Sequence, residues 1–127
     1  MKLKSYFEST GGTGILSTAD SKGHVDAAIY SRPHFIEDKM AFIMRDRLTY
    51  QNLETNPHAV YLFMEDGPGY QGKRIYLTKV KQEKNFKQIN TLKRRKRDSN
   101  PDEDKFLVFF EVDHERPLVG DDHRKEG

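Results

Sequence analysis

Residues 40–53 read MAFIMRDRLTYQNL, and this stretch decides the organisation expected for the chain. Met40–Met44 is an apolar run of strand length. A helix from Arg47 to Thr55 is predicted directly after it, and Asn56-Pro57 ends that helix because a residue before proline avoids the helical conformation. The stretch therefore predicts a strand that passes almost without a linker into a short helix.

Further strands and helices are expected on both sides of this stretch. The expected strands are Ile15–Ala19, His24–Ser31, Met40–Met44, His58–Met64, Arg74–Gln82 and Phe106–Val112. The expected helices cover residues 2–9, 47–55 and 85–97. A hairpin turn at Asp20-Ser21-Lys22-Gly23 is expected to return the chain from the first strand into the second, and another tight turn is expected at Glu37-Asp38-Lys39. Six strands joined mostly by short turns predict a mainly β fold, a six-stranded antiparallel barrel or sandwich with peripheral short helices.

The length and composition limit the class of protein. With 127 residues, the chain is expected to form a single domain over residues 1–127. The absence of cysteine excludes disulfides, thiolate metal sites and cysteine nucleophiles. No apolar stretch is long enough to span a membrane and no secretory leader is recognisable, so a cytoplasmic protein is expected. Only 35% of the residues are hydrophobic, which suggests that a partner subunit or a ligand completes the core.

Basic charge is concentrated in one run, Lys93–Arg97, although the chain as a whole carries a formal net charge of only +2. A basic run can bind nucleic acid. Here acidic residues flank the run and no aromatic residue interrupts it to stack on bases. We therefore favour a solvated basic last turn of a helix over nucleic-acid binding.

Common catalytic arrangements are missing from the sequence. No serine lies in a Gly-x-Ser-x-Gly motif, and no glycine-rich loop stands between a strand and a helix. No two histidines have the spacing of a metal site, so no metal site is assigned. None of these patterns identifies a catalytic residue. The five histidines are His24, His34, His58, His114 and His123.

The junction between the third expected strand, Met40–Met44, and the helix after it is the best candidate for a binding site. Amide groups at a helix N-terminus bind phosphate, and arginine side chains add charge-assisted hydrogen bonds. The candidates at this junction are Arg45, Arg47 and Thr49. If the second and third strands pair in a hairpin around Glu37-Asp38-Lys39, a second cluster lies near the same end of the barrel: Tyr30, Ser31 and Arg32. Such a site suits a flat, phosphorylated aromatic cofactor.

Several runs of this sequence resemble the pyridoxamine 5'-phosphate oxidase-like family of FMN-binding split barrels. The runs are GILSTAD at 14–20, VDAAIYSRPH at 25–34 and AFIMRDRLT at 41–49, continued by Asn52-Leu53, Asn56-Pro57, Val60–Phe63 and Gly67–Tyr70. The likeness extends to about Thr78 and depends more on the order of the elements than on one motif.

The resemblance implies a six-stranded split barrel that forms a homodimer with FMN at the subunit interface. It implies that Arg45, Arg47 and Thr49 hold the phosphate and that Tyr30, Ser31 and Arg32 lie beside the flavin ring or its ribityl chain. Many family members have a lysine where this chain has Thr49, so the phosphate charge is expected to be met by arginines. The family's oxidase activity is not carried over, and an oxidoreductase of unknown substrate is expected.

Two other functions remain open at this point. One is a flavin-free binding module in which Lys93–Arg97 contacts nucleic acid or another acidic partner. The other is a haem-binding split barrel with His34 or His114 as the ligand.

Overall fold

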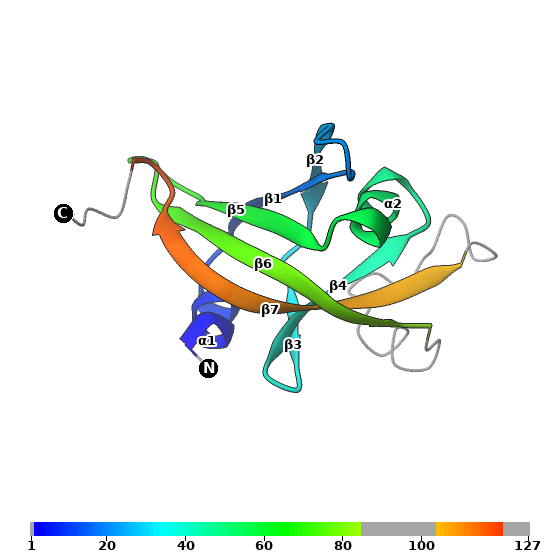
Figure 1. Cartoon of the computed structure of the whole chain (residues 1–127). Helices are drawn as coiled ribbons and strands as arrows, with labels where there is room; N and C mark the ends of the chain where they lie inside the picture. The colour runs from blue at the N-terminus through cyan, green and yellow to red at the C-terminus, as the bar shows by residue number, and fades with distance from the viewer. Residues whose placement is uncertain (1, 85–103, 121–127) are drawn as a thin grey trace.

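The computed structural model of the chain describes residues 2–84 and 104–120, which contain two short helices and seven strands (Figure 1). In chain order they are α1 (Lys2–Ser9), β1 (Gly12–Ala19), β2 (Val25–Tyr30), β3 (His34–Ile36), β4 (Lys39–Arg45), α2 (Leu48–Thr55), β5 (His58–Glu65), β6 (Gly72–Glu83) and β7 (Lys105–Pro117). The expected helix over 85–97 and the basic run within it lie outside the described residues.

All seven strands form one antiparallel sheet with the order β2-β1-β5-β6-β7-β4-β3. The prediction of a mainly β antiparallel fold with peripheral helices is confirmed. The sheet has one strand more than expected, because the three residues of β3 form a separate short strand after Pro33. Proline has no amide hydrogen to donate to a strand ladder, and Pro33 accordingly lies in the segment between β2 and β3.

The predicted hairpin of the first and second strands is confirmed, whereas the second and third predicted strands do not pair with each other. The partner of β2 is β1, with Gly14 opposite Tyr30, whereas β4 forms its hairpin with β3. The turn of that hairpin is formed by Glu37 and Asp38, whose φ angles of 55° and 62° place both in the left-handed region. Two such residues are typical of the tight turns that match the twist of paired strands.

The sheet curls around one large core, and a smaller apolar cluster of Ala41, Leu107 and Phe109 is formed by β4 and β7. Tyr30 of β2 packs edge to face on Phe42 of β4, with ring centroids 5.8 Å apart, although the two strands stand at distant positions in the sheet order. Phe7 of α1 covers one end of this core and lies 4.9 Å from Phe63, centroid to centroid. The fully buried side chains of the core include Leu16, Phe42, Tyr61, Phe63, Ile75, Leu77 and Phe110.

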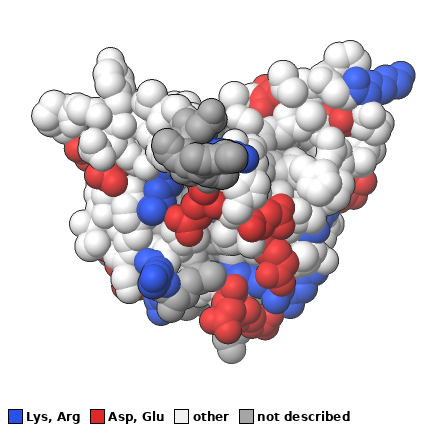
Figure 2. Space-filling view, turned by 60° about the vertical axis from the view of Figure 1, so that its left-hand side comes forward, with Lys and Arg blue, Asp and Glu red and all other residues white. Residues whose placement is uncertain are grey.

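The charged side chains of the surface form local pairs. Lys73 lies 3.1 Å from Glu115, and Lys79 lies 2.9 Å from Glu54. Figure 2 shows acidic and basic side chains intermixed on one face of the molecule, without a large area of a single sign. Within residues 2–84 and 104–120, no helix is long and apolar enough to cross a membrane.

A glycine and a tyrosine fit together inside the barrel. The hydroxyl of Tyr61 occupies the space where a side chain at Gly14 would be, so a methyl group at this position would overlap it. The same hydroxyl donates to the backbone oxygens of Tyr30 and Ser31, at 3.1 and 3.0 Å. Gly14 is therefore required for Tyr61 to reach the end of β2.

We expect Gly14→Ala to destabilise the protein, because the added methyl group must displace the Tyr61 hydroxyl from both carbonyl groups. Overpacking of a core typically lowers the free energy of unfolding by about 1–3 kcal/mol. Urea unfolding followed by circular dichroism measures the change, with the exposed neighbour Thr13→Ala as the control. Equal stability of the two variants would show that the Tyr61 contact contributes little.

Candidate functional site

The N-terminus of α2 follows the end of β4 after only two residues. Arg47 is the N-cap, with an extended backbone at φ −129° and ψ −170°, and it forms no side-chain cap hydrogen bond. The first amide groups of a helix have no partner within the helix. This end of α2 therefore presents amide donors at the positive end of the helix dipole, an arrangement that binds an anionic group.

Two predicted site residues from different elements meet beside this helix end. Tyr30, the last residue of β2, forms a side-chain hydrogen bond with Thr49, which is buried in the first turn of α2. Burial raises the pKa of Tyr30, and the bond with Thr49 acts in the opposite direction. The two residues meet because the sheet curls around the core, not because their strands form a hairpin.

Ser31 lies directly after β2 and is exposed. Its backbone oxygen accepts a hydrogen bond from the hydroxyl of Tyr61, which holds this bend from inside the barrel. The backbone next to α2 is therefore fixed by a fully buried tyrosine, while the Ser31 side chain faces the surface.

Arg32 is directed toward the other helix. Its Nη1 atom donates to the backbone oxygen of Phe7 at 2.8 Å and lies 3.5 Å from the oxygen of Thr10. These carbonyl groups belong to the C-terminal end of α1 and the residues after it, where a positive charge is favourable against the helix dipole. Thus the guanidinium of Arg32 contacts α1, whereas Tyr30 contacts α2.

A cavity of about 390 Å³ lies beside Arg32. It combines aromatic rings with side chains of both charges. Its lining residues are Lys4, Phe7, Glu8, Arg32, Pro33, His34 and Phe35. The cavity contains His34, one of the two histidines predicted as haem ligands.

Arg45 extends from the face of β4 that points away from the main core. Met44 belongs to that core, and consecutive residues of a strand point to opposite faces. Arg45 pairs in register with Lys105 of β7, a lysine that is only 7% exposed. Lys105 was not among the predicted site residues, because its only signal in the sequence is its position directly before the apolar run Phe106–Phe110.

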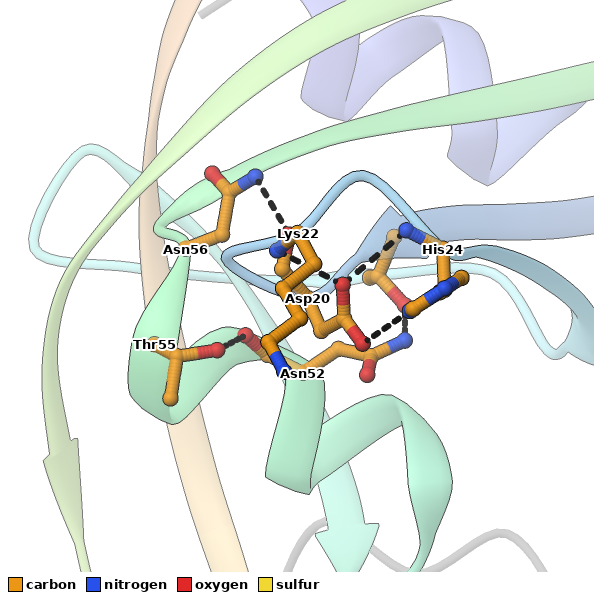
Figure 3. A network of polar contacts seen from close by, with 7 residues as sticks. Asp20, Lys22, His24, Asn52, Thr55 and Asn56 are labelled. Atoms are coloured by element: carbon orange, nitrogen blue, oxygen red, sulfur yellow. Dashed lines mark hydrogen bonds and ion pairs between the residues drawn. The ribbon is translucent and has the colours of Figure 1, made fainter.

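The body of α2 is attached to β1 by a buried hydrogen bond. The side-chain amide of Asn52 donates to the hydroxyl of Thr18 at 3.1 Å, and both side chains are about 95% buried, with exposed fractions of 5% and 4%. At the end of the helix, the side-chain amide of Asn56 reaches the backbone oxygen of Asp20 at 3.5 Å (Figure 3). These two contacts fix the helix against β1 and the turn that follows it.

Asp20 organises that turn (Figure 3). Its carboxylate accepts hydrogen bonds from the backbone amides of Lys22 and His24, both at 2.9 Å, and lies 2.9 Å from Nδ1 of His24. The bonds from His24, followed by the bond from Lys22, hold the pKa of Asp20 below its ordinary value. Asp20 thus has a structural role in the β1–β2 hairpin.

Among residues 2–84 and 104–120, no group of three or more acidic, histidine or cysteine side chains could hold a metal ion.

The sequence matches no protein-family model and no curated protein. Solved structures, in contrast, match along most of the chain. An FMN-binding protein from Syntrophomonas wolfei is 22% identical, with 91% of this chain and 82% of that chain covered and a TM-score of 0.68. A candidate pyridoxamine 5'-phosphate oxidase from Listeria innocua is 17% identical, with 92% and 95% covered and a TM-score of 0.64.

The fold is a split barrel. The resemblance to pyridoxamine 5'-phosphate oxidase-like proteins is thereby confirmed at the level of the fold. The same fold occurs in HutZ, the haem storage protein from Vibrio cholerae, which is 14% identical with 89% of each chain covered and a TM-score of 0.59. The split barrel is therefore shared by proteins that bind different cofactors.

We expect Thr18→Val to destabilise the protein by about 1–3 kcal/mol, because it leaves the buried amide of Asn52 without its partner. Asn52→Ala is expected to lower the free energy of unfolding by a similar amount. The double variant should lose less than the sum of the two, since both polar groups are then removed. Urea unfolding gives the three values, with the exposed Gln51→Ala as the control. Additive losses would contradict a direct interaction between the two side chains.

Proposed function

We propose that this protein is a flavoprotein that binds FMN, with the phosphate at the N-terminus of α2, and that it acts as an oxidoreductase. The observation that carries the proposal is the helix end itself, which has no side-chain cap and follows an arginine-containing strand end. The similarity in fold to an FMN-binding protein gives independent support.

The residues at this helix end fit a phosphate group. Arg47 is exposed at the N-cap, and the amide of Thr49 belongs to the first turn. The buried hydroxyl of Thr49 already bonds Tyr30, so we assign the phosphate contact to the backbone amides and to Arg47. The backbone of Tyr30 and Ser31 would lie beside the flavin. The bound flavin supplies electron transfer, and the chain orients it.

The absorption spectrum of the freshly purified protein tests the proposal. We expect the flavin band near 450 nm, about where free flavin absorbs, and a released compound with the mass of FMN. Arg47→Ala should weaken FMN binding roughly tenfold or more, since it removes a charge-assisted hydrogen bond. The control is Arg74→Ala, because Arg74 contacts the backbone of Pro117 at the other end of the sheet.

A colourless protein that does not bind added FMN would overturn the flavin proposal. Equal FMN affinity of Arg47→Ala and Arg74→Ala would overturn the assignment of the phosphate site alone. If the released compound is FAD or a deazaflavin, the barrel binds that cofactor and not FMN.

Haem is the second candidate cofactor, because the haem storage protein HutZ has the same fold. Of the two histidines considered, His34 lines the cavity beside α1, and His114 lies on the outer face of the sheet. A Soret band in place of the flavin band would support haem. His34→Ala and His114→Ala would then identify the ligand.

We also propose that the protein is a homodimer in which a second copy covers the outer face of β2, β1 and β5. Val25 and Ile29 of β2 are 82% and 76% exposed. The apolar surface continues onto β1 and β5. Ile15 of β1 pairs in register with Ile29 on one side and with Leu62 of β5 on the other. A contiguous apolar surface of this kind is typical of an interface. The split barrels that the sequence resembles bind their flavin at such an interface.

Ile29→Asp is expected to convert the dimer into a monomer, because it places an unpaired charge on an apolar surface that the second copy would cover. Light scattering coupled to size-exclusion chromatography measures the mass of the particle. Val119→Asp, which changes another exposed apolar side chain outside this surface, is the control. A monomeric wild-type protein, or a dimeric Ile29→Asp variant, would contradict the proposed interface.

A further inference from the structure

A second pocket of about 390 Å³ opens on the outer face of the sheet, where β1, β5, β6 and β7 lie side by side. Asn56, directly after the last residue of α2, reaches its edge. The pocket therefore lies at the opposite end of α2 from the proposed phosphate site. The residues used below are Val25, His58, Val60, Tyr76, Asp113 and His114, all of which line it.

A bulge in β7 shapes the polar side of this pocket. The register passes from Tyr76 opposite His114 to Leu77 opposite Val112, so Asp113 is an extra residue in the ladder. Consecutive strand residues ordinarily point to opposite faces. Here both Asp113 and His114 line the same pocket. Bulges are known to redirect side chains in this way and are frequent next to functional sites.

Asp113, Thr78 and His58 form a chain of hydrogen bonds with a defined direction. The hydroxyl of Thr78 donates to Oδ2 of Asp113 at 2.7 Å. The hydroxyl of Thr78 has only one proton, and Asp113 accepts it. The Thr78 oxygen must therefore accept a hydrogen bond in its 3.3 Å contact with Nδ1 of His58. In the neutral ring the proton is then on Nδ1, and Nε2 is a hydrogen-bond acceptor.

Within the described ranges, no hydrogen bond joins Nε2 of His58 to another residue. Beside it, the ring of His114 stacks on Tyr76 with centroids 4.4 Å apart and an angle of 9°. The apolar side chains of Val25 and Val60 complete the pocket. The pocket thus combines a flat aromatic surface with an imidazole acceptor and an acidic side chain, and such a set favours a planar ligand that donates hydrogen bonds.

We propose that this pocket binds a small planar aromatic molecule carrying N–H donors, which donates a hydrogen bond to Nε2 of His58 and packs beside His114. The carboxylate of Asp113 orients His58 through Thr78 and disfavours an anionic ligand. Thr78 and Asp113 are therefore positioning residues. The site does not require a flavin, because none of these residues belongs to the N-terminus of α2.

The test uses the full chain and two bicyclic probes of similar size. One is 2-aminobenzimidazole, which carries N–H donors, and the other is 2-methylbenzothiazole, which has none. We expect only the first to shift the amide signals of β5 and β7 in a ¹H–¹⁵N correlation titration. Val25 and Val60 also lie on the face that we propose to be covered in the dimer, so the titration uses the wild-type protein, in which the pocket must stay open for the proposal to hold.

Thr78→Val keeps the shape of the side chain and breaks the chain of hydrogen bonds. We expect it to weaken the affinity for 2-aminobenzimidazole about fivefold and to reduce the fraction of His58 protonated at Nδ1, as measured by imidazole ¹⁵N shifts. Thr78→Ser should retain both properties, and Thr13→Val on the same outer face is the matched control.

Binding of 2-aminobenzimidazole by the wild type, with the loss confined to Thr78→Val, supports the proposal. Absence of binding to the wild type, equal binding of the two probes, or an Nε2–H tautomer of His58 in the wild type would overturn it.

Discussion

The closure of the barrel depends on one buried hydroxyl group. Tyr61 donates from the core to two successive carbonyl oxygens at the end of β2, and it reaches them only because Gly14 has no side chain. This interaction fixes the bend after β2. The two sides of the bend then diverge, with Tyr30 bonded to α2 and Arg32 bonded to α1. Both the proposed phosphate site and the cavity beside α1 are positioned by this bend.

The polar residues between β1 and α2 have a different task. Asn52 and Asn56 connect the helix to Thr18 and to the backbone of Asp20, so the helix cannot shift along the strand without breaking a buried bond. Buried polar groups that are fully paired specify one arrangement more sharply than apolar contacts do. The amide donors at the start of α2 are consequently held by contacts made at its middle and its end.

Local patterns in the sequence were sufficient to predict most elements, because apolar runs such as Phe106–Val112 and breaks such as Asn56-Pro57 determine structure over a few residues. They predicted the hairpin of β1 and β2 but not the partners of the other strands. The contact between Tyr30 and Thr49 arises from the curvature of the whole sheet, and the burial of Lys105 arises from the pairing of β7 with β4. The bulge at Asp113, which brings two consecutive side chains to one face, has no signature in the alternation of residues.

The position of β2 at the end of the sheet has a consequence for the behaviour of the chain in concentrated solution. An edge strand can template further strands, and natural proteins counter this with charges and prolines. Here the strand VDAAIY has a single charged residue, Asp26, and the protecting Pro33 stands only beyond its end. Partial opening of the barrel would expose a segment suited to intermolecular sheet growth. Covering this strand would therefore protect the protein against aggregation.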